Sequence, residues 1–187
     1  MEKFVISQVE NYSQTYASKC IHFADKRIVS SLFWKLFFYG SKSNDGAGVG
    51  CILVILEGEK TMLACRLEFE CINNIAKYEA LVQGLYKAIN LNIKHLQVFG
   101  DSEIVIKYVR NTIHCLSGHL KHYESLVQDV TSHFKTFNIS PILRLQNASV
   151  DLLANVASKL IPPGDYSPDH FSIELIFRPS IFDNIIN

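Results

Sequence analysis

The sequence lacks three features that each define a class of protein: a long apolar run, an excess of charge of one sign, and paired cysteines. No apolar run reaches the roughly 18 residues of a membrane-spanning helix, so we expect no membrane protein. The first 30 residues lack the apolar centre of a secretory signal, which predicts a cytoplasmic or nuclear protein that is not secreted. The 18 basic and 18 acidic residues cancel. Any nucleic-acid site must therefore be local.

The cysteines and the length suit one reduced, compact domain. The five cysteines contain no CxxC pair, which indicates buried free thiols. The 187 residues, 48% of them hydrophobic, suffice for a single well-buried core with tails. We expect a leader or linker remnant over residues 1–30, the folded domain over 31–161 and a C-terminal linker or tail over 162–187. We also expect a monomer.

Hydrophobic periodicity predicts a mixed order of strands and helices. The expected strands span residues 32–39, 47–56, 61–71, 96–100 and 139–145, with one candidate strand at 173–177, and the expected helices span 73–90, 102–109, 116–134 and the residues after Ser149. This order predicts an α/β fold, in which a mixed sheet carries helices on its faces. A hairpin turn at residues 57–60 would place Cys51 opposite Cys65.

Helix starts and strand ends provide the candidate polar residues. Asn73 and Asn74 are expected to cap the first long helix, and Ser149 the last one. Asp101 follows a buried strand, and Asp151 lies in the first turn of the last helix. Capping and the helix dipole explain each carboxylate when it is taken alone.

Four segments, taken together, point to a family. They resemble, in their order along the chain, the four signature segments of ribonuclease H, and they read FFYGSKSNDGAGVG, NNIAKYEALVQGL, VFGDSEIVI and QNASVDLLANVAS. They are most similar to the form found in plant gypsy-type retrotransposon polyproteins, and the resemblance covers about residues 33–160. It implies the ribonuclease H-like fold, a five-stranded mixed sheet of three antiparallel and then parallel strands flanked by helices. It also implies cleavage of the RNA strand of RNA–DNA hybrids with two Mg²⁺ ions held by four carboxylates.

Two of the four carboxylates that the resemblance implies are replaced. Asp101 and Asp151 match the third and fourth catalytic, metal-ligating carboxylates, whereas Tyr39 and Lys77 stand at the first two positions. Glu79 cannot substitute for the second, because two positions along a helix turn a side chain roughly 200° away. We therefore predict a damaged magnesium site. Tyr39 is expected at the strand end, with its ring over that site.

The charge of Lys77 leaves two hypotheses for the position of its side chain. In the first, its ammonium group pairs with Asp101, Asp151 or both and takes the electrostatic place of the metal ions. In the second, it extends into solvent. The LRLQNAS segment contains no histidine, so the mobile histidine loop of many cellular members of the family is absent.

The resemblance also implies a nucleic-acid partner. Asn73 and Asn74 match a pair of asparagines that contacts the minor groove, where RNA displays its 2′-hydroxyl groups. Helix capping explains at least one of them equally well.

Three functions remain open on the sequence. The first is a noncatalytic ribonuclease H-like domain, a retrotransposon remnant that binds RNA–DNA hybrid or other nucleic acid. The second is an active Mg²⁺-dependent endoribonuclease for RNA–DNA hybrids. The third is an interaction scaffold with no nucleic-acid role. Loss of two metal ligands favours the first over the second, because the ions supply most of the transition-state stabilisation.

Overall fold

A computed structural model describes residues 33–55, 60–113, 117–159 and 172–182 of the chain. The strands are β1 (Trp34–Ser43), β2 (Gly46–Ile55), β3 (Lys60–Leu67), β4 (His95–Gly100), β5 (Thr136–Pro141) and β6 (Ile173–Ile176). The helices are α3 (Asn73–Asn90), α4 (Glu103–Val109), α5 (Gly118–Thr131) and α6 (Ala148–Lys159), with short 3-10 turns η1 (Arg144–Asn147) and η2 (Ser180–Phe182). None of these helices is long and apolar enough to cross a bilayer.

The strands form one mixed sheet in the order β5-β4-β1-β2-β3-β6. The β1–β2 and β2–β3 pairs are antiparallel, whereas β4 runs parallel to β1, β5 to β4 and β6 to β3. The predicted mixed α/β fold is confirmed, with six strands instead of five. The sixth is the candidate strand at 173–177, so this part of the segment expected as a linker belongs to the sheet.

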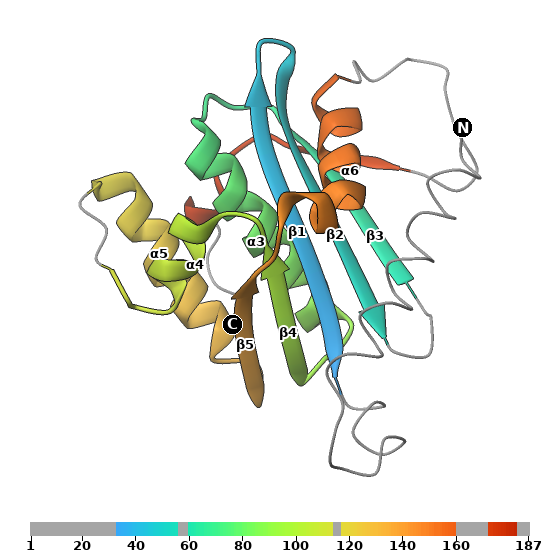
Figure 1. Ribbon diagram of the computed structural model, residues 1–187. Coiled ribbons are helices and arrows are strands. Elements are labelled where there is room, and N and C mark those ends of the chain that lie inside the picture. The colour runs from blue at the N-terminus through green and yellow to red at the C-terminus, as the bar shows by residue number, and fades with distance from the viewer. Residues whose placement is uncertain (1–32, 56–59, 114–116, 160–171, 183–187) are drawn as a thin grey trace.

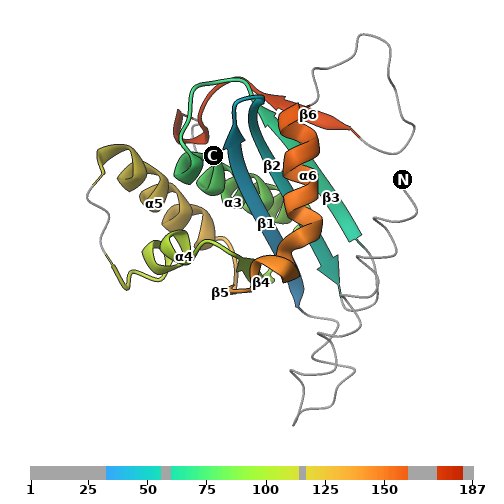
Figure 2. The same cartoon turned by 45° about the horizontal axis from the view of Figure 1, so that its top comes forward.

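Helices cover the two faces of the sheet unequally (Figures 1 and 2). On one face α3 packs against β1 and β2, with α4 and α5 beside it, and on the other face α6 crosses β1, β2 and β3. Glycines allow the close approach on both sides. A Cβ atom at Gly40 would lie 2.0 Å from the carbonyl oxygen of Ala76 in α3, and one at Gly48 would lie 2.0 Å from that of Ala154 in α6.

The core is correspondingly divided into a larger and a smaller part. The larger part lies between the sheet and α3, α4 and α5, where α3 buries the predicted positions Tyr78, Leu81, Val82 and Leu85. The smaller part lies under α6 and consists of Tyr39, Ile52, Val150, Leu153 and Ala154, with Phe37 and Val54 packed against it. Cys51, Cys65 and Cys71 are buried free thiols, as expected.

Several predicted strand limits are wrong because pairing, not local pattern, determines where a strand stops. β1 continues past Tyr39 to Ser43, because residues 40–43 pair with the start of β2. β3 ends at Leu67 instead of Cys71. In its register Cys65 lies opposite Val49, two residues from the expected partner Cys51. Residues 1–30 and the turn at 57–59 lie outside the described residues.

β5 is also shifted from the predicted range, 139–145. Its last residue, Pro141, pairs with Gly100 at the end of β4, so the chain has no neighbouring strand beyond that point. It turns instead into η1, and the side chains of Leu143 and Leu145 are 70% and 78% exposed. Helix α5 is likewise shorter than the predicted 116–134.

The predicted helix caps are not formed. The residue before α3 is Ile72, with no side-chain cap, and the side-chain oxygen of Asn73 accepts a hydrogen bond from the Lys42 backbone N–H at 2.8 Å. Ser149 lies inside α6, which continues directly from η1. Asp101 precedes Ser102, the N-cap residue of α4, which also makes no side-chain cap bond.

Candidate functional site

The topology brings the first and third positions of the implied carboxylate set together. The parallel β1–β4 pairing ends at Phe37 and Phe99, so Asp101 leaves β4 level with Tyr39 of β1. We expected Tyr39 at a strand end, but it lies inside β1, which continues to Ser43. It is only 7% exposed and belongs to the core under α6.

Lys77 reaches the same region because α3 begins against β1. A Cβ atom at Gly40 would lie 2.7 Å from the backbone nitrogen of Lys77, so the helix backbone touches the strand one residue after Tyr39. The Lys77 side chain is half-buried. Its positive charge lowers the pKa of Asp101, against the larger raising effect of burial.

Asp151 is carried to the site by the first turn of α6. Gly50, the β2 partner of Tyr39, would place a Cβ atom 2.3 Å from the carbonyl oxygen of Val150, so α6 starts directly above Tyr39. The Asn155 side-chain amide donates a hydrogen bond to Asp151 Oδ1 at 2.9 Å, which fixes the orientation of the carboxylate.

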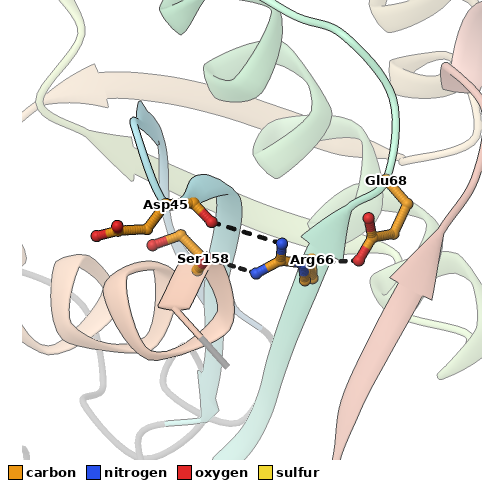
Figure 3. A network of polar contacts seen from close by, with 4 residues as sticks. All are labelled: Asp45, Arg66, Glu68 and Ser158. Carbon is orange, nitrogen blue, oxygen red and sulfur yellow. Dashed lines mark hydrogen bonds and ion pairs between the residues drawn. The ribbon is translucent and has the colours of Figure 1, made fainter. Parts of the chain in front are cut away.

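Arg66 of β3 holds the other end of α6 (Figure 3). Its guanidinium group donates to the carbonyl oxygen of Ser158 at 2.6 Å and to that of Asp45 at 3.5 Å, and it pairs with Glu68 Oε1 at 2.6 Å. A cation at the end of a helix also complements the helix dipole. The position of α6, and with it that of Asp151, is therefore fixed at both ends.

Arg144 is the site residue that the sequence analysis missed. It begins η1, where the Leu143 N–H donates to Gln146 Oε1 at 3.1 Å. Arg144 Nη2 donates to the Tyr39 hydroxyl at 3.0 Å and lies 3.7 Å from Asp151 Oδ2, and its guanidinium carbon is 5.8 Å from the Tyr39 ring centre. The predicted strand over 139–145 had placed this arginine within a sheet.

The electrostatics keep Tyr39 protonated. Burial is the main cause that raises the pKa of its phenol above 10.0, and the negative charge of Asp151 adds to this effect, against the opposing charge of Arg144. Burial also raises the pKa of Asp101, while the charges of Lys77 and Arg144 lower it. A protonated phenol is a poor ligand for Mg²⁺, which prefers carboxylate and carbonyl oxygens.

These residues do not fit a two-magnesium site. Two carboxylates, Asp101 and Asp151, face two cations, Lys77 and Arg144, so the formal charges of the four side chains sum to zero with no ion bound. In the described ranges, no three His, Cys, Asp or Glu side chains are grouped as metal ligands. The resemblance implied a site with four carboxylates.

The hypothesis that Lys77 pairs directly with a carboxylate requires correction. Within the described part of the chain, no ion pair shorter than 4 Å joins Lys77 to Asp101 or Asp151, and the cation that contacts Asp151 is Arg144. The prediction that Glu79 points away from the site is confirmed. Glu79 is buried and accepts hydrogen bonds from Tyr123 and Ser180.

The sheet order, with α3 on one face and α6 on the other, defines the ribonuclease H fold class. Ribonuclease H1 from Halobacterium salinarum matches it with a TM-score of 0.64 and 24% identity, over 67% of this chain and 96% of that one. The N-terminal ribonuclease H domain of Rv2228c from Mycobacterium tuberculosis matches it with a TM-score of 0.60 and 24% identity, over 68% of this chain and 94% of that one. At these identities the likeness shows the fold.

The family follows from the sequence comparison. Residues 38–157 match the family described as reverse transcriptase-like, and the chain belongs to that family. It is 27% identical to ribonuclease HI of Halobacterium salinarum over 118 residues, which cover 63% of this chain and 59% of that protein. It is 27% identical to the bifunctional protein Rv2228c of Mycobacterium tuberculosis over 120 residues, which cover 63% and 33%. The chain thus spans about a third of the mycobacterial relative.

Proposed function

We propose that this chain is a ribonuclease H-like domain of retrotransposon origin that binds RNA–DNA hybrid and does not cleave it. The observation that carries the proposal is the composition of the site, in which Arg144 and Lys77 balance the charges of Asp101 and Asp151. Two-ion cleavage needs a dense set of anionic ligands to hold both metals near the reacting oxygens. Here a lysine and a protonated phenol occupy two of those places.

Three observations support hybrid binding. The chain belongs to the reverse transcriptase-like family, and a structurally similar protein, LC11-RNase H1, has been solved in complex with an RNA/DNA hybrid. Asn73 is exposed and Asn74 half-exposed at the start of α3. Because the oxygen of Asn73 already accepts from Lys42, its amide N–H groups are the part that would donate to a nucleic acid.

One observation favours an active enzyme instead. Asp101 and Asp151 are both present, and the negative charge of Asp151 adds to the rise in the pKa of Asp101 that burial causes. Two carboxylates suffice to attract a divalent ion at high metal concentration, so residual cleavage is the second candidate function.

A cleavage assay separates the two candidates. The protein is incubated with a labelled RNA–DNA hybrid in Mg²⁺ and in Mn²⁺, beside a Tyr39→Asp/Lys77→Glu variant that restores four carboxylates. We expect no cleavage by the wild type and measurable cleavage by the variant. Adding Asp101→Asn to the variant must abolish that activity, which controls for a contaminating nuclease. Cleavage by the wild type would contradict the proposal if Asp101→Asn, made in the wild-type chain, removes that cleavage.

A binding titration separates a nucleic-acid-binding domain from a bare scaffold. We expect the affinity for hybrid to fall linearly with salt on logarithmic axes, because phosphate contacts release counterions. Absence of saturable binding to hybrid, at low salt, would leave the scaffold function.

A further inference from the structure

We propose that Arg144 and Lys77 form a metal-independent subsite for one phosphodiester group of the bound nucleic acid. This inference rests on the proposed function and adds to it the residues and the chemistry of contact. The subsite takes the phosphate directly on two side-chain cations, with no ion between the protein and the phosphate.

Arg144 lies on the solvent side of the site. Its side chain is 71% exposed, whereas that of Asp151, only 3.7 Å from its nearest nitrogen, is 23% exposed. A phosphate that approaches from solvent therefore meets the guanidinium group before it meets the carboxylate. One N–H of Arg144 donates to Tyr39, and its other N–H groups donate to no residue in the described ranges. Arginine presents five donors in a planar fork that matches two oxygens of a phosphate.

Tyr39 determines the direction of that fork. Its hydroxyl is fixed by the burial of its ring under α6, and it accepts one Arg144 N–H at 3.0 Å. The ring also lies 5.8 Å from the guanidinium carbon, within the range of a cation–π contact. The tyrosine that replaces the implied carboxylate thus positions a cation that faces solvent.

Lys77 supplies the second cation. The contact of Gly40 with the start of α3 fixes its backbone beside β1. Its ammonium group makes no ion pair with a described residue, so its three donors remain available. Lys77 and Arg144 come from different elements, yet both lie against neighbouring residues of β1, because the backbone of Lys77 contacts Gly40 and Arg144 donates to the Tyr39 hydroxyl. The charges of both cations also lower the pKa of the same carboxylate, Asp101.

The charge balance permits a phosphate to enter without a metal. With Asp101 and Asp151 ionised, the two cations make the site neutral, so a singly charged phosphodiester meets no net repulsion. The Asp151 carboxylate is held by a hydrogen bond from Asn155 and by its ion pair with Arg144. With a glutamate in place of Lys77 the same site would carry a net negative charge, and the phosphate would then require an added cation.

The test is a set of binding titrations of the full chain with a fluorescent RNA–DNA hybrid, in EDTA and in millimolar Mg²⁺. We expect the wild type to bind equally in both. Arg144→Gln and Lys77→Gln should each weaken binding roughly tenfold and lower the slope of log affinity against log salt by about one. Lys121→Gln, which removes one exposed charge from α5, is the matched control and should leave the slope within error. Arg144→Lys, which keeps the charge, should recover the slope but only part of the affinity.

Competition with inorganic phosphate at constant ionic strength distinguishes a backbone phosphate from a free anion. We expect weak competition, and phosphate that displaces hybrid at micromolar concentration would overturn the assignment to a phosphodiester. Hybrid binding that requires Mg²⁺, or that neither glutamine variant weakens more than Lys121→Gln does, would overturn the subsite and leave the proposed function intact. No hybrid binding by the wild type under any condition would overturn both.

Discussion

The contact between Glu79 and Ser180 attaches the segment over residues 172–182 to the core, and a substitution of Glu79 tests that attachment. The side chain is fully buried in α3, and its carboxylate accepts hydrogen bonds from the Tyr123 hydroxyl, from the Ser180 N–H at 2.8 Å and from the Ser180 hydroxyl at 2.5 Å. Gln83 donates to the same serine hydroxyl at 2.9 Å. One carboxylate therefore connects α3, α5 and η2.

Glu79→Ala removes the carboxylate that accepts from the Ser180 N–H and from the hydroxyls of Ser180 and Tyr123. A hydrogen bond to a charged group contributes about 1.5–3 kcal/mol, so we expect the free energy of unfolding to fall by at least about 3 kcal/mol. For a chain of this size that corresponds to a fall in melting temperature of roughly 6–12 °C. Glu79→Gln is the matched control, because its carbonyl oxygen still accepts from Tyr123 and the Ser180 N–H, and we expect a change below about 1 kcal/mol.

The pH dependence gives an independent check. Burial raises the pKa of Glu79 above its ordinary value of 4.5, and the hydrogen bonds from Ser180 and Tyr123 offset part of that rise. The folded state therefore binds a proton more readily than the unfolded state, so this group's contribution to stability increases as the pH falls through the raised pKa toward 4.5. Glu79→Gln should lose that increase.

Urea unfolding of the three proteins between neutral pH and pH 4.5 measures both effects. Two results would refute the reasoning: a Glu79→Ala protein as stable as the wild type, or a Glu79→Gln protein that keeps the full slope with pH.

Three further predictions concern the site and its supports. Gly48→Ala should destabilise the protein by several kcal/mol in urea unfolding, because its Cβ atom would lie 2.0 Å from the Ala154 carbonyl oxygen, whereas Gly118→Ala, with no atom within 4 Å, should not. Arg66→Ala should lower the melting temperature, since it removes the donors at the end of α6, and an unchanged value would count against that anchoring role. Tyr39→Asp alone should give little hybrid cleavage in Mg²⁺, because both cations remain in the site, and substantial turnover would show that they do not impede metal binding.

The long, periodic elements could be predicted from the sequence. The apolar positions of α3 repeat at the helical period, and its bounds and buried face follow from that repeat. The order of four short segments predicts Asp101 and Asp151 as candidate site residues. The mixed order of strands and helices was sufficient to define an α/β sheet, because few topologies accommodate it.

The details that failed depend on partners distant in the sequence. The end of β5 is set by where β4 stops, so Leu143 and Leu145, which look like core residues, are exposed. Asn73 looks like a helix cap, but its oxygen is taken by a backbone N–H of β1 that is 31 residues away. The predicted strand over 139–145 gives no reason to place Arg144 in the site, whereas the observed turn η1 does. Its guanidinium group reaches Tyr39 across 105 positions of sequence.

The position of β6 has a consequence for how much of the chain makes a self-sufficient unit. The family match ends at residue 157, whereas β6 pairs with β3 and Ser180 satisfies a buried carboxylate. A fragment cut at the family limit would leave β3 as a bare edge strand, with a row of backbone donors and acceptors open to another molecule. Such edges recruit strands from other molecules and promote aggregation. The family match and the folded sheet therefore end at different residues of this chain.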